Sequence, residues 1–159
     1  MEKIENTMDK RERIDRAWLE TAMTFGHHMS KDPECKVGAI IITLDNMLTS
    51  FGYNGFPIGV RDDADAWKDK DRKNALVVHA EVNAIIKAPF NTEGCTLYCN
   101  RKPCQYCLGV AVNARVHRIV YYNGPRWNHF DSTIFQEIAE ANPAITFTSY
   151  DRETYLGEI

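Results

Sequence analysis

The stretch CTLYCNRKPCQYCLGVAVNARVHRIVYY, residues 95–122, decides the expected fold, because it predicts a strand, a helix and a second strand in succession. CTLYC at its start and VHRIVYY at its end are short apolar and aromatic runs, which favour strands. PCQYCLGVAVNA lies between them and predicts a helix that starts just after Pro103. A strand, a helix and a further strand form a crossover, which is typical of layered α/β proteins.

The sequence on both sides adds elements that fit the same architecture. They are an amphipathic helix over residues 13–30, a hairpin within 36–55, a helix over 79–88, a helix over 131–142 that Asp131 or Ser132 caps, and a last strand over 144–150. The charged segment 59–74 is predicted to be a loop with a helical turn at most. We therefore expect an α/β fold with a mixed sheet that begins with the hairpin and continues through crossovers.

Length and charge limit the classes of protein that fit. The 159 residues suit one compact domain over residues 1–159, with residues 1–12 as a flexible N-terminal segment. No apolar run is long enough for a membrane span or a signal peptide, so we expect a cytoplasmic protein, or one in the host cytoplasm if a virus encodes it. The net charge of −3 argues against a duplex or a long RNA as the partner.

The pair of cysteines in KPCQYC allows three kinds of site. Cys104 and Cys107 could be a redox pair, or two ligands of a structural zinc ion with Cys95 or Cys99 as a further ligand. They could also be ligands of a catalytic metal. A lone CxxC does not choose among these, and the odd count of five cysteines does not suggest a disulfide framework.

The segment HAE, about two dozen residues upstream, favours the catalytic metal. His79, Cys104 and Cys107 would give zinc three ligands and leave one position open, as in catalytic zinc sites. Helix N-termini favour ionised thiols, and both halves of the motif open helices. Glu81 is too close to His79 for a comfortable fourth ligand, but it is well placed to move the proton of a water molecule. The combination H-x-E…P-C-x-x-C is the signature of zinc deaminases.

Several segments together resemble the deoxycytidylate deaminases of the cytidine deaminase-like superfamily. They appear in family order over roughly residues 13–123, and they are SKDPECKVGAIII (30–42), GYNGFPIGV (52–60), VVHAEVNAII (77–86), GCTLYC (94–99), PCQYC (103–107) and VHRIVYY (116–122). The GYNG-x-P-x-G segment separates these enzymes from deaminases that share only the zinc motif.

The resemblance implies both a fold and an activity. The fold is a three-layer α/β/α sandwich with a five-stranded mixed sheet. The activity is the zinc-dependent deamination of dCMP to dUMP with release of ammonia, which supplies dUMP for thymidylate synthesis. The family further implies one Zn²⁺ per subunit and a homo-oligomer, commonly a hexamer. It also implies activation by dCTP and inhibition by dTTP with Mg²⁺.

The resemblance also assigns roles to residues at matching positions. For the chemistry, the resemblance implies zinc ligands at His79, Cys104 and Cys107 and a proton shuttle at Glu81. For the substrate, it implies a deoxyribose contact at Asn54, a backbone contact to cytosine at Ala80, and a phosphate loop with Ser30 and Lys31, to which Lys36 is a candidate addition. For an effector, it implies contacts at Gly55, Phe56, Pro57 and Gly59. Ile58 departs from the polar or basic residue of many relatives, and Arg101 and Lys102 add positive charge near the expected mouth of the site.

Three other interpretations stay open from the sequence. The chain could deaminate a free nucleoside, although Lys31 would then meet no phosphate. It could act on dCTP, tRNA or single-stranded nucleic acid, although the acidic composition disfavours the nucleic acids. It could be a non-catalytic zinc-stabilised binding module, for which Glu81 would have no purpose.

Overall fold

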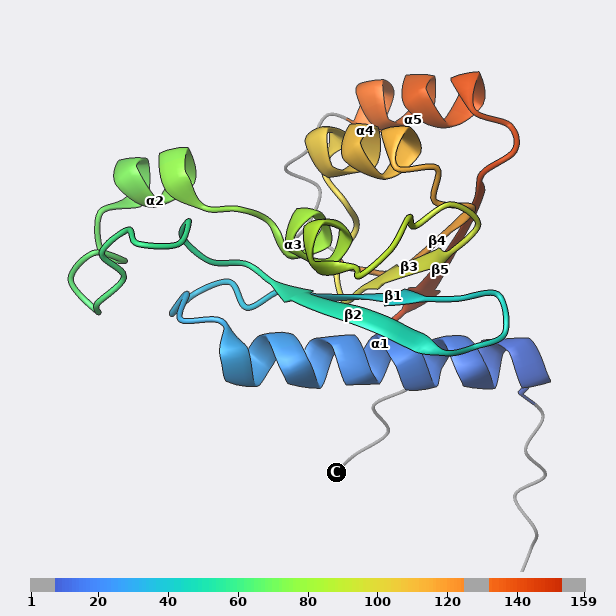
Figure 1. Ribbon diagram of the computed structural model, residues 1–159, viewed down its shortest axis with the longest axis horizontal. Helices are drawn as coiled ribbons and strands as arrows, with labels where there is room; N and C mark the ends of the chain where they lie inside the picture. The colour runs from blue at the N-terminus through green and yellow to red at the C-terminus, as the bar shows by residue number, and fades with distance from the viewer. Residues whose placement is uncertain (1–7, 125–131, 153–159) are drawn as a thin grey trace, which may run out of the picture.

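The computed structural model describes residues 8–124 and 132–152, which form one mixed β-sheet with helices on both faces (Figure 1). The helices are α1 (Lys10–Met29), α2 (Lys70–Leu76), α3 (Ala80–Lys87), α4 (Gln105–Asn113) and α5 (Ser132–Ala141). The strands are β1 (Gly38–Ile42), β2 (Leu48–Tyr53), β3 (Thr96–Cys99), β4 (Arg118–Asn123) and β5 (Thr146–Asp151). No helix in these ranges is both long and apolar enough to span a membrane.

The sheet has the order β2-β1-β3-β4-β5 and contains both kinds of pairing. β1 runs antiparallel to β2 and to β3, whereas β3, β4 and β5 run parallel. The parallel strands are joined by α4 and α5, as the sequence pattern predicts. The predicted mixed sheet, with its hairpin first and its crossovers afterwards, is confirmed.

Alternating residues of the central strands build a core on each face of the sheet. Ala39 and Ile41 of β1 face the core that contains residues of α3, α4 and α5. Ile40 and Ile42 face the opposite core, against Leu19 of α1. Figure 1 shows the same arrangement, with α1 alone below the sheet and α3, α4 and α5 above it. The predicted three-layer sandwich is confirmed.

A close approach of α3 to the sheet fixes the position of its first turn. A Cβ atom added to Gly52 of β2 would lie 2.1 Å from the backbone oxygen of Ala80 and 2.3 Å from the backbone nitrogen of Ala84. Only glycine leaves room for the helix at this distance. The N-terminus of α3 is therefore held directly against β2.

Two boundaries differ from the sequence prediction. The segment predicted as a loop contains α2, whose N-terminus is capped by Asp69 through a 3.0 Å hydrogen bond from the backbone N–H of Arg72. α1 already begins at Lys10, so residues 10–12 are helical rather than part of a flexible segment. Residues 1–7 and the predicted cap Asp131 lie outside the described residues, while Ser132 is the first residue of α5.

Candidate metal centre and active site

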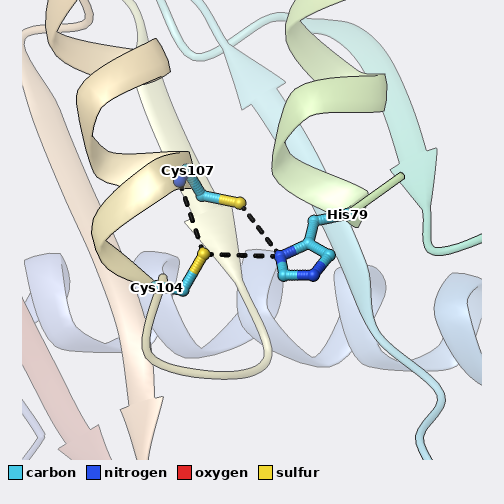
Figure 2. Close-up of side chains that lie close together, drawn as sticks. All are labelled: His79, Cys104 and Cys107. Carbon is cyan, nitrogen blue, oxygen red and sulfur yellow. Dashed lines mark hydrogen bonds between the residues drawn. The ribbon is translucent and has the colours of Figure 1, made fainter. Parts of the chain in front are cut away.

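The N-termini of α3 and α4 bring the two halves of the sequence motif together. His79 is the N-cap of α3, Cys104 is the N-cap of α4, and Cys107 lies in the first turn of α4. Figure 2 shows both sulfur atoms turned toward the imidazole ring. The two cysteines are buried and His79 is partly buried, so one side of the group stays accessible.

The ligand atoms lie at distances that suit zinc. The Nδ1 atom of His79 is 3.4 Å from the Sγ atom of Cys104 and 3.3 Å from the Sγ atom of Cys107. Tetrahedral zinc with ordinary Zn–N and Zn–S bonds would separate such atoms by about 3.5 Å. The three residues therefore fit a Zn²⁺ ion with three protein ligands, as predicted.

The electrostatics of the two thiols point to a cation as well. The Cys104 thiolate accepts a hydrogen bond from the Cys107 thiol, and this contact, helped by His79 and the backbone N–H of Cys107, lowers the pKa of Cys104 to about 4 against the opposing effect of burial. The same contact and burial raise the pKa of Cys107. A bound metal ion would ionise both thiols, because a coordinating thiol is deprotonated.

Glu81 has the environment of a proton carrier. It lies in the first turn of α3 and is 4% exposed. Burial raises the pKa of its carboxyl above the usual range, and this effect outweighs the lowering by its own backbone N–H and by His79. A raised pKa favours the protonated carboxyl, which suits a group that accepts a proton and returns it.

The loop of residues 30–37, called the substrate loop after the substrate contacts that the sequence predicts for it, passes beside Asn54 at the end of β2. The buried Asn54 side chain accepts a hydrogen bond from the backbone N–H of Val37 (2.9 Å) and donates one to the carbonyl of Cys35 (2.8 Å). The buried Ser30 hydroxyl donates to the carbonyl of Asn54 at 3.1 Å. Asn54 and Ser30 are thus brought together, and both take part in internal hydrogen bonds of the loop.

The predicted cationic residues of this loop differ in their surroundings. Lys31 is exposed, and its Nζ atom lies 2.8 Å from the carboxylate of Asp62. The Nζ atom of Lys36 donates to the backbone carbonyl of Ser30. Ala80 is fully buried at the start of α3, between His79 and Glu81.

The two extra cations before the CxxC pair have different neighbours. The guanidinium of Arg101 donates to the Cys35 thiol, which places Arg101 against the substrate loop. The Nζ atom of Lys102 lies 4.5 Å from the centre of the Phe135 ring on α5. Arg101 therefore contacts the substrate loop, whereas Lys102 packs on α5.

The predicted effector segment, residues 55–59, begins next to the metal centre and then leaves it. Gly55 pairs with Val78, the residue before His79, through hydrogen bonds of 2.8 and 3.1 Å. The ring of Phe56 stacks on Trp67 with centroids 4.0 Å apart. Gly59 takes a positive φ of 83°, and this turn starts the excursion toward α2.

Comparisons with known proteins agree with this geometry. Residues 12–123 match the family model described as the cytidine and deoxycytidylate deaminase zinc-binding region. The chain belongs to this deaminase family. It carries the zinc-binding region from which the family takes its description.

The chain is similar to several curated relatives and to a solved structure. A probable deoxycytidylate deaminase of Caenorhabditis elegans is 44% identical over 96 residues, which are 58% of this chain and 49% of the relative. The deoxycytidylate deaminase of Mus musculus is 30% identical over 127 residues, 76% of this chain and 71% of the relative. A crystal structure of the dCMP deaminase from the cyanophage S-TIM5 with dCMP and dUMP has a TM-score of 0.67 and 25% identity, and the match covers 90% of this chain and 99% of that one. The chain spans about half the length of the worm relative, and it likewise covers 55% of the human deoxycytidylate deaminase.

Sequence reasoning missed the contacts of three residues, namely Asp32, Lys73 and Cys99. Asp32 is 1% exposed and forms an ion pair of 2.8 Å with Lys73 of α2. The Cys99 thiol lies beside the Glu81 carboxyl and contributes a hydrogen bond that lowers its pKa slightly. The sequence did carry signals for two of them, namely the DP dipeptide for Asp32 and the position at the end of a predicted strand for Cys99. It carried none for Lys73, because the surrounding charged segment looks solvated throughout.

Proposed function

We propose that this protein catalyses the hydrolytic deamination of dCMP to dUMP, with water consumed and ammonia released. The observation that carries the proposal is the buried Glu81 carboxyl beside the group His79, Cys104 and Cys107. When bound by these three ligands, zinc supplies the Lewis acid that activates water near neutral pH. The matches to deoxycytidylate deaminases support the substrate.

Glu81 moves the protons of this reaction. Its carboxylate takes a proton from the attacking water and delivers it to N3 of cytosine as the new C4–O bond forms. It then takes the proton of the new C4 hydroxyl and passes it to the amino group, which leaves C4 as ammonia while the C4–O bond becomes the carbonyl of uracil. The dry surroundings that raise the pKa of Glu81 make the protonated form accessible for this second step.

The substrate loop supports a nucleotide as the substrate. Asn54 would contact the deoxyribose, and the backbone of Ala80 would contact the cytosine ring. Ser30, Lys31 and Lys36 would hold the 5′-phosphate through charge-assisted hydrogen bonds. Lys31 is exposed, and an exposed ion pair such as Lys31–Asp62 contributes little stability, so its ammonium can exchange Asp62 for phosphate.

Ammonia release with three substrates tests the proposal. The zinc-loaded protein is expected to turn over dCMP efficiently, and deoxycytidine and dCTP poorly. Efficient turnover of deoxycytidine would show a nucleoside deaminase instead, and turnover of dCTP alone would move the activity to the triphosphate. No ammonia from any of the three would favour the zinc-stabilised binding module.

A variant of Lys31 tests the phosphate contact. Lys31→Ala should lower kcat/KM for dCMP by an amount that corresponds to about 1.5–3 kcal/mol, the range for a hydrogen bond to a charged group. The kcat/KM for deoxycytidine should stay unchanged. Lys68→Ala is the matched control, because Lys68 is also exposed and also forms an ion pair, with Asp65 at 2.7 Å. Equal losses on both substrates would assign Lys31 a role in folding.

The family resemblance supports three further parts of the proposal. The protein would act as a homo-oligomer, with a hexamer favoured. It would be activated by dCTP and inhibited by dTTP with Mg²⁺, through Gly55, Phe56, Pro57 and Gly59. It would work in the cytoplasm, or in the host cytoplasm for a virus-encoded protein.

A further inference from the structure

We propose that Asp32 is a positioning residue for dCMP turnover, which together with Lys73 holds the substrate loop and Asn54 in their binding geometry. This inference rests on the proposed function. It concerns an ion pair that joins two segments 41 residues apart in the sequence. Neither residue belongs to the metal centre.

The Asp32 carboxylate organises the turn of the substrate loop. One of its oxygens, Oδ1, accepts hydrogen bonds from the backbone N–H groups of Glu34 (2.9 Å) and Cys35 (3.0 Å). The same carboxylate lies 2.8–2.9 Å from the Nζ atom of Lys73. The side chain of Asp32 is 1% exposed and that of Lys73 is 13% exposed, so the pair is shielded from water.

The carboxylate also sets the orientation of the Asn54 amide. The Nδ2 atom of Asn54 lies 3.4 Å from the second oxygen of Asp32 and 2.8 Å from the carbonyl of Cys35. An ionised carboxylate only accepts hydrogen bonds, so it requires the amino side of the amide to face it. The Oδ1 atom of Asn54 is thereby turned toward the backbone N–H of Val37.

Lys73 connects this loop to the chain that carries the first metal ligand. It lies in α2, whose C-terminus leads directly through Val77 and Val78 to His79. Within the described ranges, three ion pairs join the segment 56–78 to the substrate loop. Two are exposed, namely Lys31–Asp62 and the 3.8 Å pair Lys70–Glu34. Exposed ion pairs contribute little to stability, so these two do little to fix the loop. The pair Asp32–Lys73 is the shielded connection.

The kinetics of Lys73 variants test this role. Lys73→Met removes the cation and leaves the backbone N–H groups of Glu34 and Cys35 on the Asp32 carboxylate, so the carboxylate keeps hydrogen-bond partners. It should raise KM for dCMP by about 10-fold or more, with kcat within about 3-fold of the parent, because the lost groups act on binding and touch no reacting atom. Lys73→Arg should restore most of the affinity. Zinc content should equal that of the parent in both variants.

Two further variants complete the experiment. Lys70→Met is the matched control, since it removes the exposed pair from the same helix, and its KM should equal that of the parent. Asp32→Asn places an amino group against Lys73 and Asn54, and should raise KM in the same way. In the double variant with Lys73→Met, Asp32→Asn should raise KM little further, because both changes remove the same Asp32–Lys73 interaction.

Several results would overturn the inference. An unchanged KM in Lys73→Met would do so, and so would a fall in kcat that only follows lost zinc or lost folded protein. If Lys70→Met raised KM as much as Lys73→Met does, the effect would come from the loss of any positive charge on α2 and not from the Asp32–Lys73 pair. These results are separate from a failure of the proposed function, which would appear as absent dCMP turnover in the parent protein.

Discussion

Glu81 is the residue whose surroundings define the chemistry most sharply. It is buried and carries a raised pKa, yet it stands beside residues that can hold a cation. Glu81→Gln keeps the shape and the burial but cannot move a proton. We expect the variant to bind zinc normally and to lose about 10²–10⁴-fold in kcat, the usual contribution of a general acid–base group.

Zinc content and kcat, measured on the same preparation, check this expectation. Glu93→Gln is a suitable control, because Glu93 is an exposed glutamate paired with Arg115 at 3.3 Å. Near-normal turnover in the Glu81 variant would make that carboxyl a structural group.

Cys104 is the second residue with a distinct test. Its position as the N-cap of α4 and its distance to His79 make it a ligand, so Cys104→Ser should lose the bound metal. The loss should also lower the melting temperature, since metal binding stabilises the folded state. Cys35→Ser, at a thiol of the substrate loop, should keep one zinc per subunit. Metal analysis after dialysis measures both, and full zinc in Cys104→Ser would rule out the proposed ligand set.

At the scale of elements, the sequence predicted what short-range patterns encode. The run GAIII became the buried strand β1, because apolar residues on both of its faces meet a core. The N-terminal positions of His79 and Cys104 also followed from their helices. The helix α2 did not follow, because its stability depends on the Asp69 cap and on contacts such as Lys73–Asp32 rather than on an apolar stripe. That pair spans 41 residues of sequence, and no local pattern marks it.

Another long-range contact ties α1 to the sheet on the face opposite the metal centre. The fully buried carboxylate of Asp15 in α1 accepts hydrogen bonds from Arg118 of β4 at 2.5 and 2.6 Å. The hydroxyl groups of Tyr98 and Tyr150 each donate to it at 2.8 Å. Because removing one partner leaves a buried charge, Asp15→Asn should lower the free energy of unfolding by about 3–5 kcal/mol.

The pH dependence of this loss has a defined sign. Burial alone would raise the pKa of Asp15, but the hydrogen bonds from Arg118, Tyr150 and Tyr98 outweigh it and lower the pKa below the usual 3.8. The contribution is therefore present above pH 3.8 and disappears as the pH falls through the lower folded-state pKa. Urea unfolding from pH 7 down to about pH 3 should show the difference between the parent and Asp15→Asn shrinking at the acid end. Asp65→Asn, at an exposed pair, should cost less than about 1 kcal/mol at every pH.

At the scale of the whole molecule, the segment from Phe56 to Leu76 projects from the layered body, as Figure 1 shows for α2 and the chain before it. Its inner contacts include the stack of Phe56 on Trp67 and a contact of the Arg72 guanidinium, 5.2 Å from the centre of the Phe56 ring. The side chain of Ile58 in this segment is fully exposed in the single chain. A projecting segment with an exposed apolar side chain is suited to contact a second subunit, consistent with the proposed homo-oligomer.

Hydrogen bonds link the start of the predicted effector segment, residues 55–59, to the residue before the metal ligand His79. Gly55 is hydrogen-bonded to Val78, and Val78 is followed by the ligand His79. A nucleotide that shifts residues 55–59 would therefore shift the start of α3. At sub-saturating dCMP, we expect dCTP to raise the rate and dTTP with Mg²⁺ to lower it, each by a factor of about 5 or more, the lower end of typical coupling.

Phe56→Ala tests whether the segment transmits this effect. The change removes the stack on Trp67, so both effector responses should weaken while zinc content and the rate at saturating dCMP stay near those of the parent. Phe90→Ala is the matched control, because Phe90 is an exposed phenylalanine after α3, and it should keep both responses. Rates at low dCMP with each nucleotide, and sedimentation velocity under the same conditions, give the answer. A parent protein that ignores both nucleotides would contradict effector control altogether, whereas equal responses in Phe56→Ala and the parent would place the coupling outside this segment.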